Sequence, residues 1–313
     1  MTGGAGFIGS AIVKFLSDKG HEVTVYDDFS RGSRSRLKTS DNVKLINGDI
    51  RDFDSLNEAL QSNLFETVVH LAYINGTQNF YSRPTEVLDV ALIGMQNIIR
   101  VISSTGIRRF YLASSSEVYQ NPGIFPTPEE VSLVVPDPTN PRYSYGLGKI
   151  VQEFMALHYL SNVEQTIIFR PHNIYGQDMG FGHVIPELFS KISKDGQEEI
   201  WLKGDGMQTR SFCYIDDFIT AFQKLYSPQI ENGVYNIGSN EEITILNLAI
   251  LISKFYGGNK KFRVSPKPVG ETNRRLPDIS KIEKLGYTPT VSITEGLDKY
   301  FAWYSRMSDT LDI

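Results

Sequence analysis

The chain has 313 residues, which is enough to bury a large core in one unit or two lobes. Its formal net charge of −5 argues against a nucleic-acid-binding surface. Its single cysteine excludes an internal disulfide framework, its five histidines show no metal-binding spacing, and no apolar run approaches the roughly 20 residues of a membrane span. We expect a cytoplasmic protein that binds neither nucleic acid nor membrane and holds no metal.

The first motif is the glycine-rich segment 2–9, TGGAGFIG, which runs into an apolar helical pattern that ends at Gly20. Glycines let the backbone approach a pyrophosphate, and the start of the helix supplies free N–H groups and a positive dipole end. This pattern predicts a dinucleotide-binding loop. Its candidate contacts are Gly3, Gly6, Phe7, Ile8 and Gly9.

The next apolar segment, 22–26, predicts a strand that ends at Asp27. An acidic residue about 20 positions after the glycine loop suits the hydroxyls of an adenosine ribose. Asp27 and Asp28 would repel a 2′-phosphate, which favours NAD over NADP as cofactor. Arg31 and Arg34 favour NADP instead, because their side chains could reach such a phosphate.

A doubly wound sheet needs a hydrophobic strand before the glycine loop, yet the loop here begins at residue 2. That strand is central in this topology, so its neighbours would lack ladder partners without it. We expect that the start of the sequence is truncated or misassigned. We also expect the chain to gain stability from about six apolar residues added in front, the length of a typical strand.

Strand and helix patterns alternate through the rest of the first half, which predicts an α/β fold with a doubly wound parallel sheet. Ligands bind such sheets at the carboxyl ends of the strands. Asp49 and Ala72 lie at such strand ends, and the adjacent Ile50 and Leu71 complete the candidate cofactor contacts. The predicted strands are 43–46, 67–71, 110–112 and 166–169, and the helices are 55–60, 86–104 and 149–160.

Beyond Pro171 the alternation loosens, which indicates a smaller C-terminal substrate lobe. We expect a Rossmann domain at 1–170 plus about 233–258, and a substrate lobe at about 171–232 plus 259–313. The Pro- and Arg-containing stretch 266–277 is interpreted as a loop over a ligand.

Tyr145 and Lys149 lie four residues apart at a predicted helix start, so both side chains share one face. A free tyrosine has a pKa of about 10. A nearby ammonium group lowers it, which makes the phenol usable as a general base near neutral pH. The alternative is a buried aromatic ring beside a solvated lysine.

These ordered motifs resemble the extended short-chain dehydrogenase/reductases, specifically the nucleotide-sugar epimerases, dehydratases and decarboxylases. The resemblance covers nearly the whole chain. It rests on segments 2–9, 49–50, 70–72, 114–119, 145–149, 170–176 and 204–217.

The resemblance implies a role for each site residue. Tyr145 would take the proton of the sugar C4 hydroxyl, and Lys149 would hold the nicotinamide ribose and lower the pKa of Tyr145. Ser115 would hydrogen-bond the C4 oxygen. The remaining expected substrate contacts are Ser116, Asn173, Arg210 and Arg275, the last two through phosphate.

The role of Glu117 determines which reaction we expect after oxidation at C4. The run Ser115-Ser116-Glu117 resembles the Thr-Ser-Glu of GDP-mannose dehydratases and UDP-glucuronate decarboxylases, so Glu117 is a candidate base at C5. It could also orient a carboxylated substrate, or simply cap a loop. Two departures from the family are Ala91, where an asparagine is common, and Gln120, where a glycine is usual.

We therefore predict an NAD-dependent nucleotide-sugar epimerase or dehydratase of carbohydrate metabolism, an isomerase or lyase that works through a 4-keto intermediate. The alternatives are a nucleotide-uronic acid decarboxylase and a non-catalytic, NAD-binding regulatory protein. The resemblance also implies a homodimer that pairs through helices 86–104 and 149–160.

Overall fold

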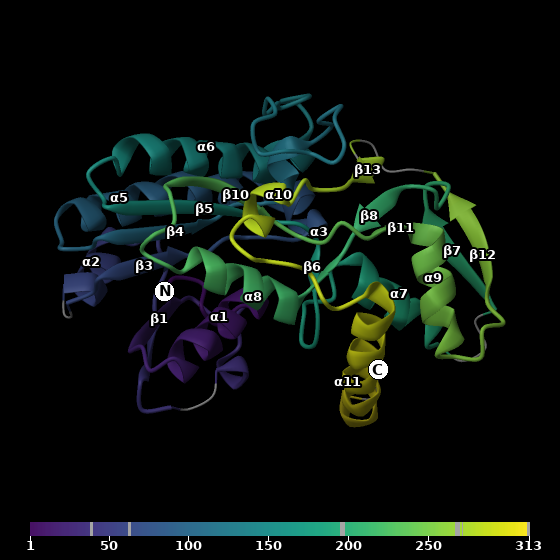
Figure 1. The fold of residues 1–313 in the computed structure, drawn as a ribbon. Coiled ribbons are helices and arrows are strands. Elements are labelled where there is room, and N and C mark those ends of the chain that lie inside the picture. Colours follow the sequence, from purple (N-terminus) through teal and green to yellow (C-terminus); the bar gives the residue numbers. More distant parts are fainter. Residues whose placement is uncertain (38–39, 62–63, 195–197, 267–269, 271, 312–313) are drawn as a thin grey trace. The chain divides into compact units, whose positions relative to one another are not determined.

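A computed structural model describes residues 1–37, 40–61, 64–194, 198–266, 270 and 272–311 (Figure 1). The chain divides into two compact units. Unit 1 comprises 1–120, 132–171 and 221–235, and unit 2 comprises 121–131, 172–220 and 236–313.

This division differs from the expected boundaries at 121–131, 171, 221–232 and 236–258. Residues 221–235 fall in unit 1, where the ring of Tyr226 packs 5.2 Å from that of Tyr111. Residues 236–258 fall in unit 2, where the ring of Phe255 packs 5.9 Å from that of Phe189.

Unit 1 is built on parallel strands, and the predicted α/β class is confirmed. The strand order is β2-β1 in one sheet and β3-β4-β5-β10 in the other, with parallel register between β1 and β2, β3 and β4, and β4 and β5. Strands β4 and β5 read as near-continuous buried runs, which is typical of a sheet covered on both faces. The strands are β1 (Val23–Asp27), β2 (Val43–Asn47), β3 (Thr67–His70), β4 (Arg109–Ala113), β5 (Gln165–Pro171) and β10 (Gly233–Ile237).

The helices of unit 1 lie on both sides of these strands (Figure 1). Helices α5 and α6 lie on one side, and α1 lies on the other. The predicted helix 86–104 is an α-helix, a π-helical turn (Val90–Gly94) and a second α-helix in succession. The helices are α1 (Phe7–Asp18), α2 (Phe53–Gln61), α3 (Thr77–Ser82), α4 (Pro84–Asp89), α5 (Met95–Ser103) and α6 (Ser144–Tyr159).

Between β1 and β3 the sheet is held by the first residues of the chain. Among the described residues, Thr2 alone forms a bridge to each neighbour, to Tyr26 of β1 and to His70 of β3. Its N–H donates to the carbonyl of Val69 and its own carbonyl accepts from the N–H of Leu71, both at 3.0 Å. Beyond Thr2, the two sheet segments are not joined by a further described bridge.

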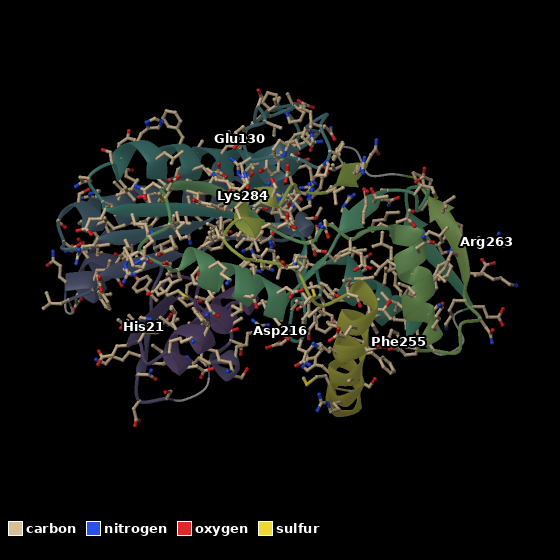
Figure 2. All side chains as sticks on the ribbon, viewed as in Figure 1. His21, Glu130, Asp216, Phe255, Arg263 and Lys284 are labelled. Carbon is tan, nitrogen blue, oxygen red and sulfur yellow. The ribbon has the colours of Figure 1, made fainter. Side chains whose placement is uncertain are left out.

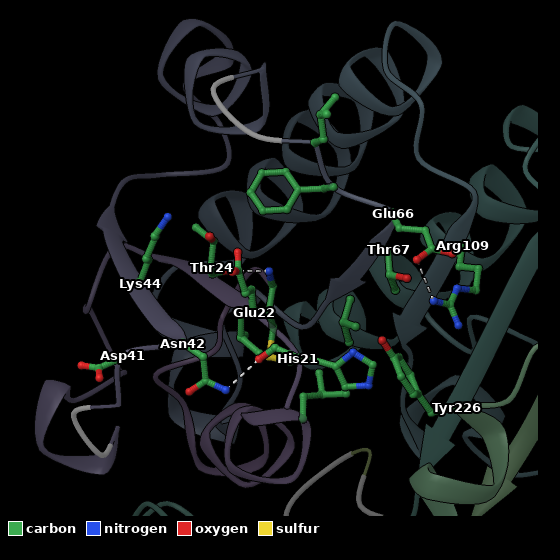
Figure 3. Close-up of a pocket in the computed structure, with 16 residues that line it drawn as sticks. His21, Glu22, Thr24, Asp41, Asn42, Lys44, Glu66, Thr67, Arg109 and Tyr226 are labelled. Atoms are coloured by element: carbon green, nitrogen blue, oxygen red, sulfur yellow. Dashed lines mark hydrogen bonds and ion pairs between the residues drawn. The ribbon is translucent and has the colours of Figure 1, made fainter. Parts of the chain in front are cut away.

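A cavity of about 470 Å³ lies beside this bridge (Figure 3). Thr24 and Lys44 line it on one side, and Thr67 and Arg109 line it on the other. The Met1 ammonium group lies at its edge and donates to the carbonyl of Thr24 at 2.6 Å. Burial lowers the pKa of this ammonium group to about 5. The cavity is therefore lined both by strand residues and by the buried amino group of Met1.

Unit 2 contains three small sheets with strand orders β11-β8-β13, β12-β7 and β6-β9. Its aromatic core gathers around the fully buried Phe189, whose ring lies 4.8 Å from that of Tyr300. The ring of Phe255, labelled in Figure 2, stacks 4.6 Å from that of Phe301. Residues 267–269 and 271 of the expected ligand loop lie outside the described residues.

The strands named in unit 2 are β6 (Ile174–Tyr175), β7 (Glu199–Lys203), β8 (Thr209–Ser211), β9 (Cys213–Tyr214), β11 (Glu242–Thr244), β12 (Lys261–Ser265) and β13 (Arg274–Arg275). The helices are α7 (Val184–Ile192), α9 (Ile245–Lys254), α10 (Ser280–Glu283) and α11 (Ile293–Leu311), with α8 (Ile215–Leu225) shared between the units. No helix in the described part of the chain combines the length and apolarity that a membrane crossing requires.

An engineered extension of six β-branched apolar residues ahead of Met1 is predicted to raise the melting temperature by roughly 5 °C or more. The added strand would fill the cavity, pair with β1 and β3, and replace the buried ammonium group with a peptide bond. Differential scanning calorimetry measures the change. An extension of six Gly and Ser residues is the matched control, and equal melting temperatures for both extensions would contradict the prediction.

Candidate functional site

The glycine loop is closed by backbone contacts that exclude side chains. Gly3 has φ +70°, and a Cβ built on it would lie 2.5 Å from the amide nitrogen of Ala72. A Cβ on Gly9 would lie 2.2 Å from the carbonyl oxygen of Gly3. Gly6, the N-cap of α1, has an ordinary φ of −73°, and its Cβ would lie 3.3 Å from the same oxygen. Gly3 and Gly9 therefore shape the loop, while Gly6 leaves an open approach to the start of α1.

Asp27 ties this loop to the end of β1. Its Oδ2 accepts from the N–H of Ala5 and its Oδ1 from the N–H of Phe29, both at 2.9 Å. The carboxylate is buried, and burial is the main reason why its pKa is raised despite these two hydrogen bonds. A carboxylate has about four acceptor positions, so capacity remains for ribose hydroxyls. The guanidinium of Arg34 lies over the ring of Phe29, 4.4 Å from its centroid.

The expected contacts after β2 and β3 lie at the carboxyl ends of those strands. The Asp49 carboxylate accepts from the side chain of Arg51, with Nε 2.9 Å from Oδ2. Ile50 is buried, and its carbonyl accepts from Nδ2 of Asn97 at 3.0 Å. The amide of Ala72, which follows Leu71, donates to Oγ1 of Thr2 at 3.4 Å. Sequence reasoning missed Asn97, because its side chain acts across 47 residues of chain.

These residues fit a dinucleotide such as NAD. A glycine-rich loop leads into the N–H groups at the start of α1, a carboxylate lies at the end of β1, and Ala72 follows β3 closely. All of these groups belong to unit 1. Within the described ranges, no cluster of side chains could hold a metal ion.

Tyr145 and Lys149 both lie on α6, as the spacing predicts, and both are buried. The ammonium nitrogen of Lys149 lies 6.0 Å from the centroid of the Tyr145 ring. It donates to the carbonyl of Ala113 at 2.7 Å and to Oε1 of Gln152 at 3.1 Å. Burial lowers the pKa of Lys149 to about 7, and the charge of Glu153 opposes this shift. The charge of Lys149 therefore responds to pH near neutrality.

Two aromatic side chains that the sequence analysis missed fix the ring of Tyr145. Phe80 stacks on it with centroids 4.8 Å apart, and Tyr73 meets it edge-on at 4.9 Å. Both come from segments that follow β3, far from α6 in sequence. No local pattern marks them as neighbours of Tyr145.

The serine run after β4 is anchored by a buried ion pair. Arg170 donates from Nε and Nη2 to the two carboxylate oxygens of Glu153, at 2.8 and 2.6 Å, and both side chains are about 5% exposed. The Ser114 hydroxyl donates to the same carboxylate, and Arg170 also donates to the Tyr119 hydroxyl at 2.7 Å. This network holds both ends of the segment 114–119.

The three residues after Ser114 differ in their environments. The Ser115 hydroxyl accepts from the N–H of Glu117 at 3.1 Å, while Ser116 is buried. The two carboxylate oxygens of Glu117 accept from Nη2 of Arg142, at 3.3 and 3.2 Å. The sequence analysis did not anticipate Arg142, although it lies only three residues before Tyr145.

The three expected substrate contacts of the C-terminal lobe lie in unit 2. Asn173 has φ +43°, and its Nδ2 donates to the carbonyl of Ser211 at 2.8 Å. Arg210 and Arg275 are brought together, because they face each other in the register of β8 and β13. Arg210 donates to the carbonyl of Thr272 at 2.8 Å, and Arg275 donates to the hydroxyl of the same residue at 3.2 Å. Their roles toward phosphate remain predictions.

The chain is similar in sequence to a family of known proteins. Residues 1–238 match a family profile described as the NAD dependent epimerase/dehydratase family. The chain is 33% identical to UDP-glucuronic acid decarboxylase 1 of Danio rerio, over 98% of this chain and 72% of the relative. It is 30% identical to the UDP-N-acetyl-alpha-D-glucosaminuronate decarboxylase of Bacillus cytotoxicus, over 99% of this chain and 98% of the relative.

A solved structure is similar over the same extent. The UDP-glucose 4-epimerase of Thermotoga maritima, crystallised with UDP-glucose, superposes with a TM-score of 0.87 at 25% identity. The alignment covers 98% of each chain.

Gly9→Ala and Gly6→Ala are predicted to separate loop stability from cofactor binding. Gly9→Ala should lower the free energy of unfolding by about 1–3 kcal/mol, because its Cβ meets backbone that cannot move aside. Gly6→Ala should change that free energy by less than about 1 kcal/mol but weaken NAD binding, since its Cβ points into the approach to α1. Urea denaturation and calorimetric titration with NAD measure both effects. Equal stability losses in the two variants would contradict this account of the loop.

Glu153→Gln is predicted to lower the free energy of unfolding by about 3–5 kcal/mol, because it leaves the buried guanidinium of Arg170 unpaired. Glu164→Gln is the matched control, since Glu164 accepts from Arg108 in the same bidentate way on the surface. There the loss of stability should be much smaller, because solvent screens an exposed ion pair. Chemical denaturation compares the two, and similar losses would show that the buried pair does not anchor the serine run.

Proposed function

Because this chain belongs to the NAD-dependent epimerase/dehydratase family, and is an enzyme that uses NAD, we propose that its substrate is a nucleoside diphosphate sugar. The sugar is oxidised transiently at C4 to a 4-keto intermediate. Support for this substrate class comes from the three similar proteins named above, each of which has a UDP-linked sugar in its name, and from the paired arginines of unit 2. A guanidinium binds phosphate oxygens bidentately, which suits a diphosphate.

The single observation that carries this proposal is the buried pair of Tyr145 and Lys149 on α6, beside the serine run. The glycine loop and Asp27 would hold NAD, which would supply the hydride acceptor for the sugar C4 and the hydride donor for the return step. The ammonium of Lys149 stabilises the phenolate form of Tyr145, which takes the proton of the C4 hydroxyl and becomes the neutral phenol. Ser115 donates a hydrogen bond to the C4 oxygen, which lowers the energy of the developing carbonyl.

The partner of Glu117 bears on the step that follows oxidation. A 4,6-dehydration needs a base aimed at the C5 proton, whereas the ion pair with Arg142 holds both oxygens of Glu117 toward that guanidinium. We therefore favour reactions without such a base, with 4-epimerisation first. It needs only rotation of the 4-keto sugar and return of the hydride to its other face.

Decarboxylation of a nucleotide-linked uronic acid is the second candidate. A 4-keto uronic acid is a β-keto acid, so its carboxylate leaves as CO₂ while the electron pair moves through C5 to the C4 oxygen. A proton then adds to C5, and no base is required. Arg142 favours this candidate, because a guanidinium that binds the Glu117 carboxylate can also bind a substrate carboxylate.

A homodimer belongs to the same proposal. Exposed apolar side chains lie on the π-helical turn and on α6, the helices expected to pair: Leu92, Ile93, Phe154, Leu157 and Tyr159. Covering such a patch is a common reason for soluble chains to associate. We place the enzyme in the cytoplasm, as its single cysteine suggests.

The reaction is tested by incubating the protein with NAD and UDP-glucuronic acid, UDP-glucose or UDP-N-acetylglucosamine in deuterated water, followed by NMR. A C4-inverted product without deuterium is expected for an epimerase. Release of CO₂ with deuterium at C5 would identify the decarboxylase. Loss of the C6 oxygen with deuterium at C5 would overturn our account of Glu117.

Tyr145→Phe is the control in each incubation. It should lower kcat by roughly 10²–10⁴-fold, because it removes the general base, and it should keep NAD binding. Unchanged biological function in this variant, with no turnover by the wild type, would instead support the non-catalytic regulatory protein.

A further inference from the structure

Lys149 poses an electrostatic problem that its hydrogen bonds do not fully solve. The residue is 2% exposed, and an ammonium group has three N–H donors. Two of them are used by the carbonyl of Ala113 and the side chain of Gln152. Both acceptors are neutral, so neither compensates the buried charge directly.

The charged and titratable groups around Lys149 contribute little. Glu153, the anion that acts on it from α6, has its carboxylate engaged by Arg170 and Ser114. His70 of β3 is neutral, since burial, together with the charge of Lys149, lowers its pKa to about 3. The remaining titratable neighbours are the phenols of Tyr145 and Tyr73.

Tyr73 supplies the missing contact. The ammonium nitrogen of Lys149 lies over its ring, 4.0 Å from the centroid, which is well inside the range of a cation–π interaction. The edge of the same ring meets the ring of Tyr145 at 4.9 Å and 80°. Tyr73 therefore contacts both members of the pair on α6.

The position of this ring is set by the small residues around its hydroxyl. A Cβ built on Gly148 would lie 2.1 Å from the hydroxyl oxygen of Tyr73 and 2.8 Å from the Cβ of Ala91. The hydroxyl is buried, and no hydrogen-bond partner is described for it. Gly148 and Ala91 thus leave room for the tyrosine, and the space is filled by packing rather than by a polar contact.

We propose that Tyr73 is a positioning residue for the Tyr145–Lys149 pair, and that its ring holds the Lys149 ammonium group in place and in its charged form. The hydroxyl has no part in this role. The consequence for catalysis rests on the proposed function, because only a charged Lys149 can stabilise a phenolate at Tyr145. The contact itself does not depend on which reaction the enzyme performs.

The test compares Tyr73→Leu with Tyr73→Phe by urea denaturation at pH 6 and pH 9. Phenylalanine keeps the ring, and leucine removes it. Folded Lys149 is charged at pH 6 and largely neutral at pH 9, because its pKa is about 7, whereas in the unfolded chain it is charged at both. The ratio of the unfolding constants, leucine over phenylalanine, should be roughly fivefold larger at pH 6 than at pH 9.

The same comparison in a Lys149→Met background is the control. In this background the cavity left by leucine remains, but residue 149 carries no charge. The ratio of the unfolding constants should therefore become independent of pH. A pH-independent ratio in the Lys149 protein would overturn the proposal. The proposal would also be overturned if the pH dependence of the unfolding constant changed as much in Tyr73→Phe as in Tyr73→Leu, relative to wild type.

Activity provides a second and separate readout. In the pH profile of kcat/KM, the alkaline limb of Tyr73→Leu should move down by roughly half a pH unit, while that of Tyr73→Phe should stay in place. If the pH-dependent ratio is seen without any turnover, the proposed reaction fails and the role of Tyr73 stands. If turnover is seen and the ratio is flat, the role of Tyr73 fails alone.

Discussion

Burying the ammonium group of Lys149 is the constraint on which the architecture of the unit 1 site depends. A charge in a protein interior costs several kcal/mol unless neighbours compensate it. Three neutral groups contact the ammonium nitrogen of Lys149: the carbonyl at the end of β4, the side-chain amide of Gln152 and the ring of Tyr73. Each comes from a different segment of unit 1. The sheet, α6 and the segment after β3 must therefore be correctly packed before the pair with Tyr145 exists.

The same logic explains the second buried charge. Glu153 and Arg170 are nearly completely hidden, and they compensate each other with additional bonds to Ser114 and Tyr119. This network fixes the serine run between the end of β4 and its short 3-10 turn. The placement of Ser115 and Glu117 thus depends on a buried ion pair that is bonded to Ser114 and Tyr119.

Close packing of the backbone governs the cofactor side in the same way. Gly3 and Gly9 are needed because neighbouring peptide groups occupy the space of their Cβ atoms, and Asp27 then locks the loop to β1. The bridge at Thr2 joins β1 to β3 within two residues of that loop. The geometry of the loop and the pairing of the strands around Thr2 therefore depend on each other.

The sequence by itself determined the alternating α/β pattern, the glycine loop, Asp27, and the shared helix face of Tyr145 and Lys149. These features depend on local periodicity and short spacing, which a sequence displays directly. Only the tertiary structure decided what surrounds them. Tyr73 on Lys149, Arg142 on Glu117, and Arg170 on Glu153 are contacts between segments up to 76 residues apart, and no local pattern encodes them. The reacting groups can be predicted from the sequence. Their availability cannot, because a lone pair or a charge is engaged or left available by partners that only folding brings near.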